Sequence, residues 1–470
     1  MKFLFILILQ ITIFHAQGSV EITGSANHFR MMSSPVSGQI LSDLLDELWT
    51  QGMTAGGDQT TGGGANVWTY SGSAWVTVTD ISNSGTSLSA GQGFIVFVFI
   101  DTDFDGDTGD SGANGYLPVT LSVSGSPWTL NTVYNTSNQA TDSWHLLGNP
   151  YATTIDVDLD GDGDGATLFT LNNTSFNQVV YIYDSSSGNY ISWNGSAGGV
   201  TGGLIKPYQG FFVQAKNTTT QLYMFHLSKC NTGGTSGTFY RQRDTSNNGS
   251  ISFIISTDTY IDKTYISFSE NGEVLMDDSD AYKLLPLTAN ERIVGISYVE
   301  ENGLDVNNLP YFQDQNISVP LDIMYLITDN DYNYVTKDKD DVTINWDLSS
   351  VPDHISFSLT DNITGNIIDL NLENEYFFST YEKGSFSSYN TNGTGPGIYP
   401  QIGESRFLLT VHYNNISGDI NEDGILNILD IIEIIALILI NEYNEEADFN
   451  GDMELNVLDV VMIVDSILTN

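Results

Sequence analysis

Two short acidic segments near the C-terminus have the residue types and the spacing that calcium chemistry requires. The first runs from Asp419 to Asp430, and the second runs from Asp448 to Asp459, 29 residues further along the chain. Calcium is a hard cation that takes about six to eight oxygen ligands, which a short loop supplies from positions 1, 3, 5, 7, 9 and 12. Both segments offer oxygen atoms at these positions, so each is predicted to be a calcium loop.

The predicted ligands follow one pattern in both loops. Side chains bind from positions 1, 3, 5 and 12, a carbonyl from position 7, and position 9 acts through water. The ligands are therefore Asp419, Asn421, Asp423, Ile425, Asn427 and Asp430 in the first loop, and Asp448, Asn450, Asp452, Glu454, Asn456 and Asp459 in the second. The alternative is an acidic surface turn, because 58 Asp and Glu residues create some such spacings by chance. A second matching copy argues against chance.

The two loops and the apolar runs that follow them make residues 418–470 resemble a type I dockerin, a paired-loop module that binds a cohesin domain. This resemblance implies Ca²⁺ as the cofactor and a cohesin-like protein as the partner. Met453 occupies position 6 of the second loop, where the sharp turn favours glycine, so the second site is predicted to be strained or weaker. Positions 10 and 11, the candidate partner contacts, are apolar here instead of small and polar: Ile428, Leu429, Val457 and Leu458.

The segment 428–440 after the first loop is apolar on nearly every side, which predicts a helix that is buried on more than one face. Its 13 residues are too few to cross a bilayer. Two interpretations stay open. The helix packs on a second helix at 457–468 and on a neighbouring domain, or its remaining apolar surface forms a protein interface.

The first residues predict export from the cytoplasm. One lysine is followed by an apolar run and then by small residues up to about residue 18, as in a secretory signal peptide. No later apolar stretch reaches membrane-spanning length, so we expect a secreted or cell-surface protein. Cys230 is the only cysteine and excludes an intramolecular disulfide. Export without disulfides favours a bacterial source.

The charge of the chain excludes one class of partner. With only 14 Lys and Arg residues, the formal net charge is -44 at pH 7. Nucleic-acid binding depends on basic side chains that displace counterions from phosphates, so a nucleic-acid partner is not expected.

The body of the chain is predicted to be mainly β. Short apolar alternations are separated by turn residues, which is typical of β-sandwiches. Residues 29–35 correspond to 144–150 at an offset of 115, and 92–96 correspond to 209–213 at an offset of 117. A repeat of this length indicates a duplicated domain. The predicted organisation is a signal peptide at 1–18, β-domain repeats at 19–140 and 141–232, a further β-sandwich at 236–415, and a small α-helical calcium-loop module at 418–470.

Other features of the repeats leave alternatives open. The many tyrosines and tryptophans either fill cores and cross-strand pairs or stack on sugars, and Trp75 lies near the counterpart of Trp193. Residues 40–49 predict a helix with leucines at helical spacing. The acidic runs 101–107 and 156–164 are either calcium sites or solvated loops.

The third β-domain, with a hairpin predicted at 357–370, completes a body that resembles the stalk-like β-domains of secreted bacterial proteins that usually carry a type IX sorting tail. The resemblance covers about residues 20–415 and brings no catalytic residues. A dockerin-like tail stands where the sorting domain is expected, so the export and anchoring route stays open.

No catalytic motif is present, and the six histidines are scattered along the chain. The sequence therefore predicts a secreted, calcium-binding protein that docks to a partner through its C-terminal module, with β-domains for surface adhesion or scaffolding. The alternative is a polysaccharide-binding or polysaccharide-degrading component of a cohesin–dockerin assembly. If the protein is an enzyme, a glycoside hydrolase is expected, because that reaction needs only two suitably spaced carboxylates.

Overall fold

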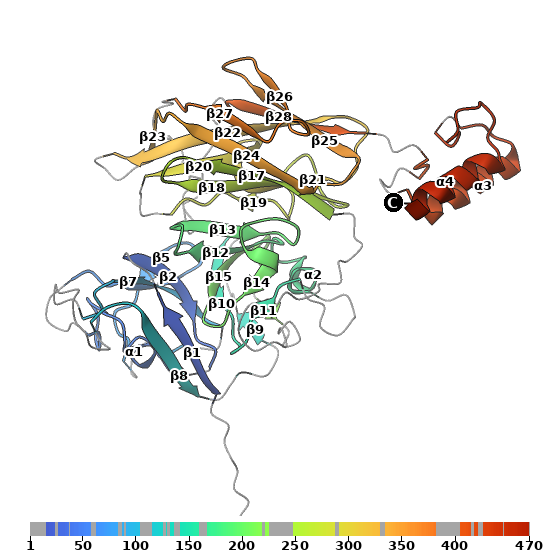
Figure 1. Ribbon diagram of the computed structural model, residues 1–470. Helices are drawn as coiled ribbons and strands as arrows, with labels where there is room; N and C mark the ends of the chain where they lie inside the picture. The colour runs from blue at the N-terminus through green and yellow to red at the C-terminus, as the bar shows by residue number, and fades with distance from the viewer. Residues whose placement is uncertain are drawn as a thin grey trace, which may run out of the picture. The chain divides into compact units, whose positions relative to one another are not determined.

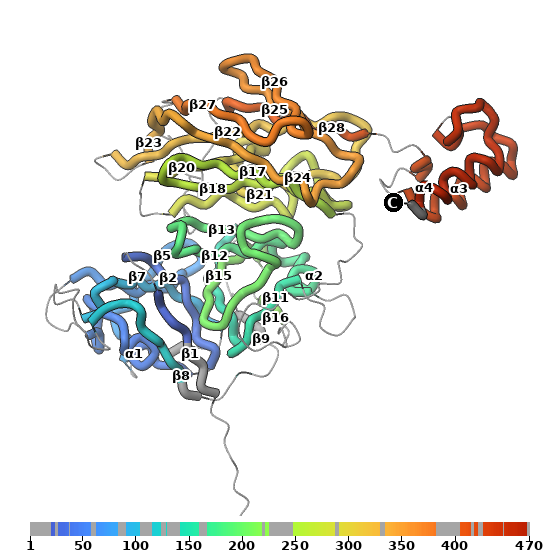
Figure 2. Tube along the Cα trace, viewed as in Figure 1, coloured from blue at the N-terminus to red at the C-terminus, as the bar shows by residue number. Residues whose placement is uncertain are grey.

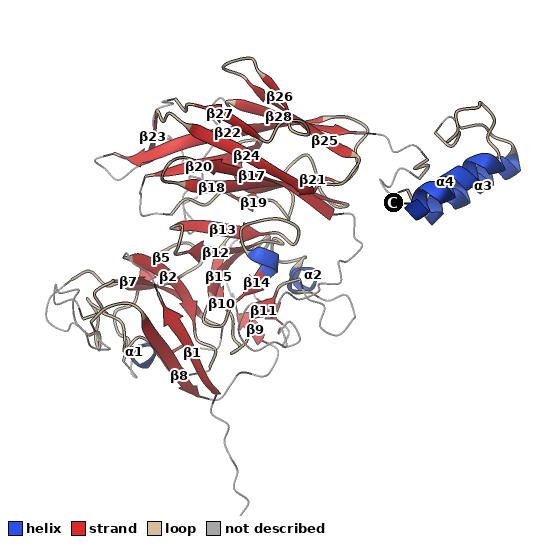
Figure 3. Cartoon of the chain, in the orientation of Figure 1, coloured by secondary structure: helices blue, strands red, loops and turns tan. Residues whose placement is uncertain are grey.

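The computed structural model shows a chain built mainly from β-strands, with two long helices at its C-terminal end (Figure 3). This confirms the predicted fold class. The residues that the structure describes are 16–23, 27–36, 38–57, 63–82, 87–88, 91–103, 115–125, 128, 132–135, 142–158, 167–218, 221–224, 248–286, 291–329, 334–381, 405–414, 418–421, 426–444 and 446–469. The predicted signal peptide falls almost wholly outside these residues, and so does Cys230.

The chain divides into two compact units. Within the described residues, the first unit comprises 16–191 and 200–224, and the second comprises 192–199, 248–381 and 405–469. The finer domain boundaries given above remain predictions.

The first unit contains two four-stranded sheets with the same strand order (Figure 1). In each, the strand that opens the repeat pairs with the strand that closes it, and a hairpin lies beside the closing strand. The first sheet has the order β2 (His28–Ser33), β7 (Gly93–Val98), β4 (Val67–Tyr70) and β5 (Trp75–Thr77), and the second has the order β10 (Trp144–Gly148), β15 (Gly210–Gln214), β12 (Val180–Asp184) and β13 (Asn189–Trp193). The duplicated β-domain is thus present.

The two copies meet through equivalent backbone groups. Met32 forms an antiparallel bridge with Gln209, and Gln92 forms one with Leu147. The N–H of Ser33 donates to the carbonyl of Tyr208, and the N–H of Gly148 donates to that of Gly91, both at 2.8 Å. The repeat offsets relate each contact to the other, so the copies pack as a pseudo-symmetric pair, like the two halves of an isologous dimer. Figure 2 shows β2 and β15 side by side.

Glycines allow this close approach. A Cβ atom on Gly148 would lie 2.0 Å from the Cβ of Ser33, its own counterpart in the first repeat. Only one of these two facing positions can therefore carry a side chain. Gly93 and Gly210, the glycines of the closing strands, also have no space for a Cβ, which would lie 2.5 Å from the Leu147 carbonyl oxygen and 2.8 Å from a Met31 side-chain atom, respectively.

Aromatic rings fill the contact between the two copies. Phe212 of the second repeat lies edge-on to Tyr70 and Trp75 of the first, with ring centroids 5.2 and 5.7 Å apart. Phe29 lies edge-on to Tyr183 across the same contact at 6.2 Å. Such edge-to-face geometry is typical of packed cores. These rings therefore hold the repeats together.

Smaller elements complete the first unit. The predicted helix at 40–49 is shorter than expected: α1 spans Leu41–Leu44, and a turn follows, although all four leucines of its apolar face are buried. The remaining elements are the pairs β1 (Ala16–Ile22) with β8 (Val119–Gly125), β3 (Gln39–Ile40) with β6 (Ser87–Leu88), β9 (Thr132–Asn135) with β16 (Gln221–Met224), and β11 (Ile155–Asp156) with β14 (Leu204–Ile205), the helix α2 (Leu168–Asn172) and the 3-10 turn η1 (Thr201–Gly203).

The second unit is built on one 12-stranded sheet that folds over a shared apolar core. Its main path runs β26 (Ile367–Asp369), β25 (Ile355–Asp361), β28 (Phe407–Tyr413), β22 (Ile317–Thr328), β20 (Arg292–Val299), β21 (Asn302–Pro310), β18 (Ile261–Ser269), β17 (Asn248–Ser256), β24 (Val342–Ser350) and β27 (Glu375–Phe378), with β19 (Ala281–Tyr282) on β21 and β23 (Tyr334–Lys337) on β22. The predicted hairpin is formed by β25 and β26, and Gly365 has the positive φ of 75° that its turn requires.

The C-terminal module consists of two loop–helix units, with α3 at Ile428–Ile440 and α4 at Val457–Thr469. The helices pack on each other around Ile431, Ile434 and Ile463. Gly418, at φ +88°, stands against Ile463 and Phe449, so this turn requires glycine both for conformation and for space. Among the described helices, none combines the length and the apolar character needed to cross a membrane.

Candidate calcium-binding and docking module

Each helix of the module begins with the same hydrogen-bond network. At the start of α3, the side-chain oxygen of Asn427 accepts from the Leu429 N–H at 2.8 Å, and an oxygen of Asp430 accepts from the Asn427 N–H at 2.7 Å. This reciprocal pair is a capping box, which satisfies main-chain donors that the first turn leaves without a helical partner. The second oxygen of Asp430 accepts from Ile420 at 3.0 Å and thereby ties the loop to the helix.

The second copy repeats this network 29 residues later. The side chain of Asn456 accepts from the Leu458 N–H at 2.9 Å, and Asp459 accepts from the Asn456 N–H at 2.9 Å. The other oxygen of Asp459 accepts from the Asn450 N–H at 3.2 Å. Asp430 and Asp459 are both fully buried. Two buried carboxylates at equivalent helix starts are the central feature of the module.

The front of the second loop is lined by acceptor oxygens. Asp448 accepts from the Asp452 N–H at 3.1 Å and from the Met453 N–H at 2.7 Å. Asn450 and Asp452 accept from the N–H groups two residues further on. The loop backbone therefore curls around its own carboxylate and amide oxygens.

The environment of Asp448 favours its charged form. Burial acts to raise the pKa of this carboxyl, but hydrogen bonds from the Met453 N–H, from the Tyr443 hydroxyl and from neighbouring loop N–H groups hold the pKa below its ordinary value. Asp448 thus keeps the ionised state that a calcium ligand needs over a wider acidic range than a free aspartate does.

Position 6 of the second loop has the backbone conformation that calcium loops need at this place. Met453 has φ +68° and an exposed side chain. The left-handed region is unfavourable for a residue with a Cβ, so the second loop contains local strain. Its counterpart Gly424 lies outside the described residues.

The structure places the predicted ligands unevenly. Asp419, Asn421, Asn427 and Asp430 are described in the first loop, while Asp423 and Ile425 lie outside the described residues. All six predicted ligands of the second loop are described. Across the described part of the chain, no three His, Cys, Asp or Glu side chains gather as a group that could hold a metal ion. The acidic runs are described only at 101–103 and 156–158.

The donor chemistry of the module fits calcium. Each loop offers carboxylate and amide oxygens, and each contains a buried aspartate at position 12. Hard oxygen donors around buried negative charge suit Ca²⁺ better than softer metals.

Both helices also expose apolar side chains at equivalent positions. Ile432 and Val461, separated by the repeat offset, are each 58% exposed. The set comprises Ile428, Leu429, Ile432 and Ile435 on α3, and Val457, Leu458, Val461 and Val464 on α4. We call these eight residues the apolar faces. They include all four candidate partner contacts. The predicted burial of the segment 428–440 on more than one face is wrong, because Ile431 and Ile434 are its only buried apolar residues and both belong to the core shared with α4. The helix thus packs on α4, and the interface formed by its exposed apolar residues stays a prediction.

The sequence interpretation missed the capping role of positions 9 and 12. The side chains of Asn427 and Asn456 cap the following helices, and their water-mediated contact with calcium stays a prediction. The signal was present, because an Asn followed three residues later by an Asp before an apolar run is a helix-start pattern.

Comparison with known proteins gives one match. Residues 417–468 match the family model of the dockerin type I domain. No curated protein and no solved structure shows significant similarity to the chain. The predicted resemblance of the C-terminal module is thus confirmed.

Proposed function

We propose that this is an exported, calcium-dependent docking protein whose C-terminal module binds a cohesin-like domain through the apolar faces of α3 and α4. One observation carries the proposal: two equivalent loop–helix units each combine a buried position-12 aspartate with exposed apolar residues at the helix start. The match to the dockerin type I domain supports it, since that domain docks to cohesin-type partners.

The proposed role of calcium is structural. Bound at each loop, the ion would neutralise the acidic side chains and tie the loop to the helix that follows. The residues that would hold it are the twelve predicted ligands. The chain itself supplies the rest: capping boxes fix where each helix begins, and these starts position Ile428, Leu429, Val457 and Leu458.

The chemistry of the apolar faces indicates the kind of partner surface. Apolar side chains that remain exposed on a small module gain free energy when they are covered, at about 25 cal/mol per Å² of apolar surface buried. A partner that recognises Ile, Leu and Val here must present a complementary apolar patch. We therefore propose that the specificity differs from that of dockerins with small polar residues at these positions.

The body is proposed to serve adhesion or scaffolding. Its aromatic rings favour this role over sugar binding, because rings of the first unit pack edge-to-face on one another and Trp193, in the second unit, is only 8% exposed. A sugar-binding platform would need exposed, coplanar rings.

Calcium titration by calorimetry on the full chain tests the metal sites. The Asp430→Ala/Asp459→Ala double variant should lose two binding events that the wild type shows. A matched control, Glu433→Ala/Asp465→Ala, removes the same charge from α3 and α4 and should keep both events. Equal heats for wild type and loop variant would contradict the proposed sites.

Binding to purified type I cohesin domains that present an apolar dockerin-facing surface tests the docking surface. The Ile432→Lys/Val461→Lys variant should lose binding while it retains calcium. Ile367→Lys, which changes an exposed isoleucine of β26, is the control and should bind as the wild type does. Unchanged binding by the Ile432→Lys/Val461→Lys variant would show that the apolar faces are not the surface that binds the cohesin domain.

A further inference from the structure

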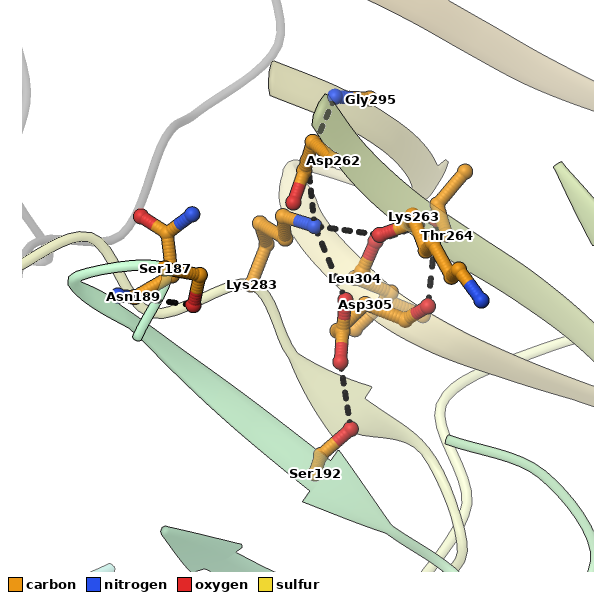
Figure 4. Close-up of polar contacts among 10 residues, drawn as sticks. All are labelled: Ser187, Asn189, Ser192, Asp262, Lys263, Thr264, Lys283, Gly295, Leu304 and Asp305. Carbon is orange, nitrogen blue, oxygen red and sulfur yellow. Dashed lines mark hydrogen bonds and ion pairs between the residues drawn. The ribbon is translucent and has the colours of Figure 1, made fainter. Parts of the chain in front are cut away.

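A lysine is enclosed by two aspartates in the second unit (Figure 4). The Lys283 Nζ lies 2.7 Å from Asp262 Oδ2 and 2.9 Å from Asp305 Oδ1. All three side chains are buried, with at most 9% of each exposed. Nζ also donates to the main-chain carbonyl of Lys263 at 2.6 Å. The amine is therefore held against two carboxyl groups away from water.

The sheet brings these groups together from distant parts of the sequence. Asp262 lies on β18 and Asp305 lies on β21, which pairs in parallel with β18. Lys283 follows β19, which pairs with the same β21. Rigid strands thus fix an amine and two carboxyl groups in contact, and such fixed proximity replaces a bimolecular encounter with an intramolecular one.

Each carboxyl group has a further donor of its own. The Gly295 N–H donates to Asp262 Oδ2 at 2.9 Å, and the Ser192 hydroxyl donates to Asp305 Oδ2 at 2.5 Å. Gly295 N–H is thus positioned to stabilise negative charge that develops on an Asp262 oxygen. The Ser192 hydroxyl occupies the Asp305 oxygen that does not contact Lys283.

The charges of this cluster do not balance. Two carboxylates and one ammonium would leave one buried negative charge, which is costly in a protein interior. Burial raises the pKa of Asp262 above its ordinary value, and this effect outweighs the nearby Lys283 and the Gly295 hydrogen bond. Burial would lower the pKa of Lys283, but both aspartates raise it. One carboxylic acid, one ammonium and one carboxylate form the combination of these three groups that leaves no net buried charge.

We propose that Lys283 and Asp262 condense to an intramolecular isopeptide bond, with Asp305 as the proton acceptor. The ammonium gives one proton to the Asp305 carboxylate and becomes a neutral amine. Nζ then attacks Cγ of the Asp262 carboxylic acid and the C–N bond forms. The C–O bond to the hydroxyl breaks, and this hydroxyl takes one of the two remaining Nζ protons and leaves as water, so that the amide nitrogen keeps one proton. The product is a neutral amide beside a protonated Asp305, so no buried charge remains.

Such a bond suits the composition of the chain. A single cysteine excludes an intramolecular disulfide. The isopeptide bond would close the segment between residues 262 and 283 covalently, which restricts the unfolded chain as a disulfide does. It would strengthen the second unit independently of the proposed docking function.

Mass spectrometry of the full-length purified chain tests the bond. Trypsin cuts after Arg243, Lys263 and Arg292, so the wild type should yield peptides 244–263 and 264–292 joined together, uncut at Lys283, with a mass lower by one water. Lys283→Met and Asp262→Ala should each lack the joined species, and Asp305→Ala should form it more slowly or not at all. Lys263→Met, an exposed neighbour, is the control and should keep the loss of one water in the intact mass.

Separate, unmodified peptides from the folded wild type would overturn the proposal. A loss of one water without joined peptides would overturn it too, because that change would then lie elsewhere. Because wild type alone decides these outcomes, poor folding of a variant does not obscure them.

Discussion

The chain contains two internal duplications, and they use their copies in opposite ways. In the first unit, the β-repeats face each other, share backbone hydrogen bonds and bury aromatic rings between them. In the C-terminal module, the loop–helix copies share only a small core and leave apolar residues exposed at equivalent positions. Duplication supports stability in the first case and presents surface in the second.

The copies differ because of what each can bury alone. A four-stranded sheet has a broad face, and a second such sheet covers it. A short loop–helix unit buries little, so the core of the module is limited to a few residues such as Ile434 and Ile463, and the remaining apolar positions stay at the surface. Substitutions in both duplications test this contrast between β-repeats that bury their contact and loop–helix copies that leave apolar residues exposed.

The largest effect is expected at the core of the module. Ile434→Ala removes a fully buried side chain and should cost about 2–5 kcal/mol, whereas Ile432→Ala changes an exposed residue of the same helix and should stay within about 0.5 kcal/mol. Hydrogen exchange of the α3 amides in the full chain measures both. Similar losses of α3 stability in Ile434→Ala and Ile432→Ala would contradict the assignment of Ile434 to the core and of Ile432 to the exposed apolar face.

The next largest effect is expected at His145, a buried histidine of the second β-repeat. Burial lowers the pKa of His145 to about 4, below its value in an unfolded chain. Between about pH 4 and 6.5 the unfolded chain therefore binds more protons, so the stability of the first unit should rise with pH across this window and fall on acidification. The contribution is about 3.5 kcal/mol, from about 1.4 kcal/mol per pKa unit.

Urea unfolding at several pH values measures this dependence, with His145→Gln as the control. The variant keeps a polar side chain near Ser143, the hydrogen-bond partner of His145, but has no titratable group. Its stability should change less with pH than that of the wild type. An identical pH profile for both proteins would show that another group causes the dependence.

The third prediction tests the facing pair of the β-repeats. Gly148→Ser should cost about 1–3 kcal/mol, because its Cβ would overlap that of Ser33. Adding Ser33→Gly exchanges the two residues between the copies and should recover part of the loss, since space is restored.

Urea unfolding of the single and double variants forms a double-mutant cycle. Gly64→Ala, where a Cβ meets open space, is the control and should have little effect. Additive losses from Gly148→Ser and Ser33→Gly would mean that the copies do not meet at this pair.

The smallest effect is expected at Met453. Met453→Gly removes the Cβ that makes the φ of +68° unfavourable at this position. The calcium affinity of the second site should therefore rise by about 1 kcal/mol, or about fivefold. Calorimetric titration of the full chain measures the change. A weaker second site in the glycine variant would show that the methionine contributes in another way.

Much of the fold and of the site could be predicted from local patterns. Alternating strands, the repeat offsets and the spacing of oxygen donors are properties of the sequence, so they indicate a β-rich body, a duplicated domain and a dockerin-like tail. The helix at 40–49 was predicted too long, because leucine spacing reports the apolar face of a segment and not where its backbone turns.

Other features depend on distant residues. That Ser33 faces Gly148, or that Asp262, Lys283 and Asp305 meet at one buried point, follows from strand pairing across long separations, which local composition does not encode. The sequence by itself determined which residues could bind calcium and which segments repeat. Tertiary structure alone decided which repeats bury their contact, which apolar residues stay exposed, and which lysine amine is buried away from solvent. The reason is that burial depends on how distant segments of the chain pack together.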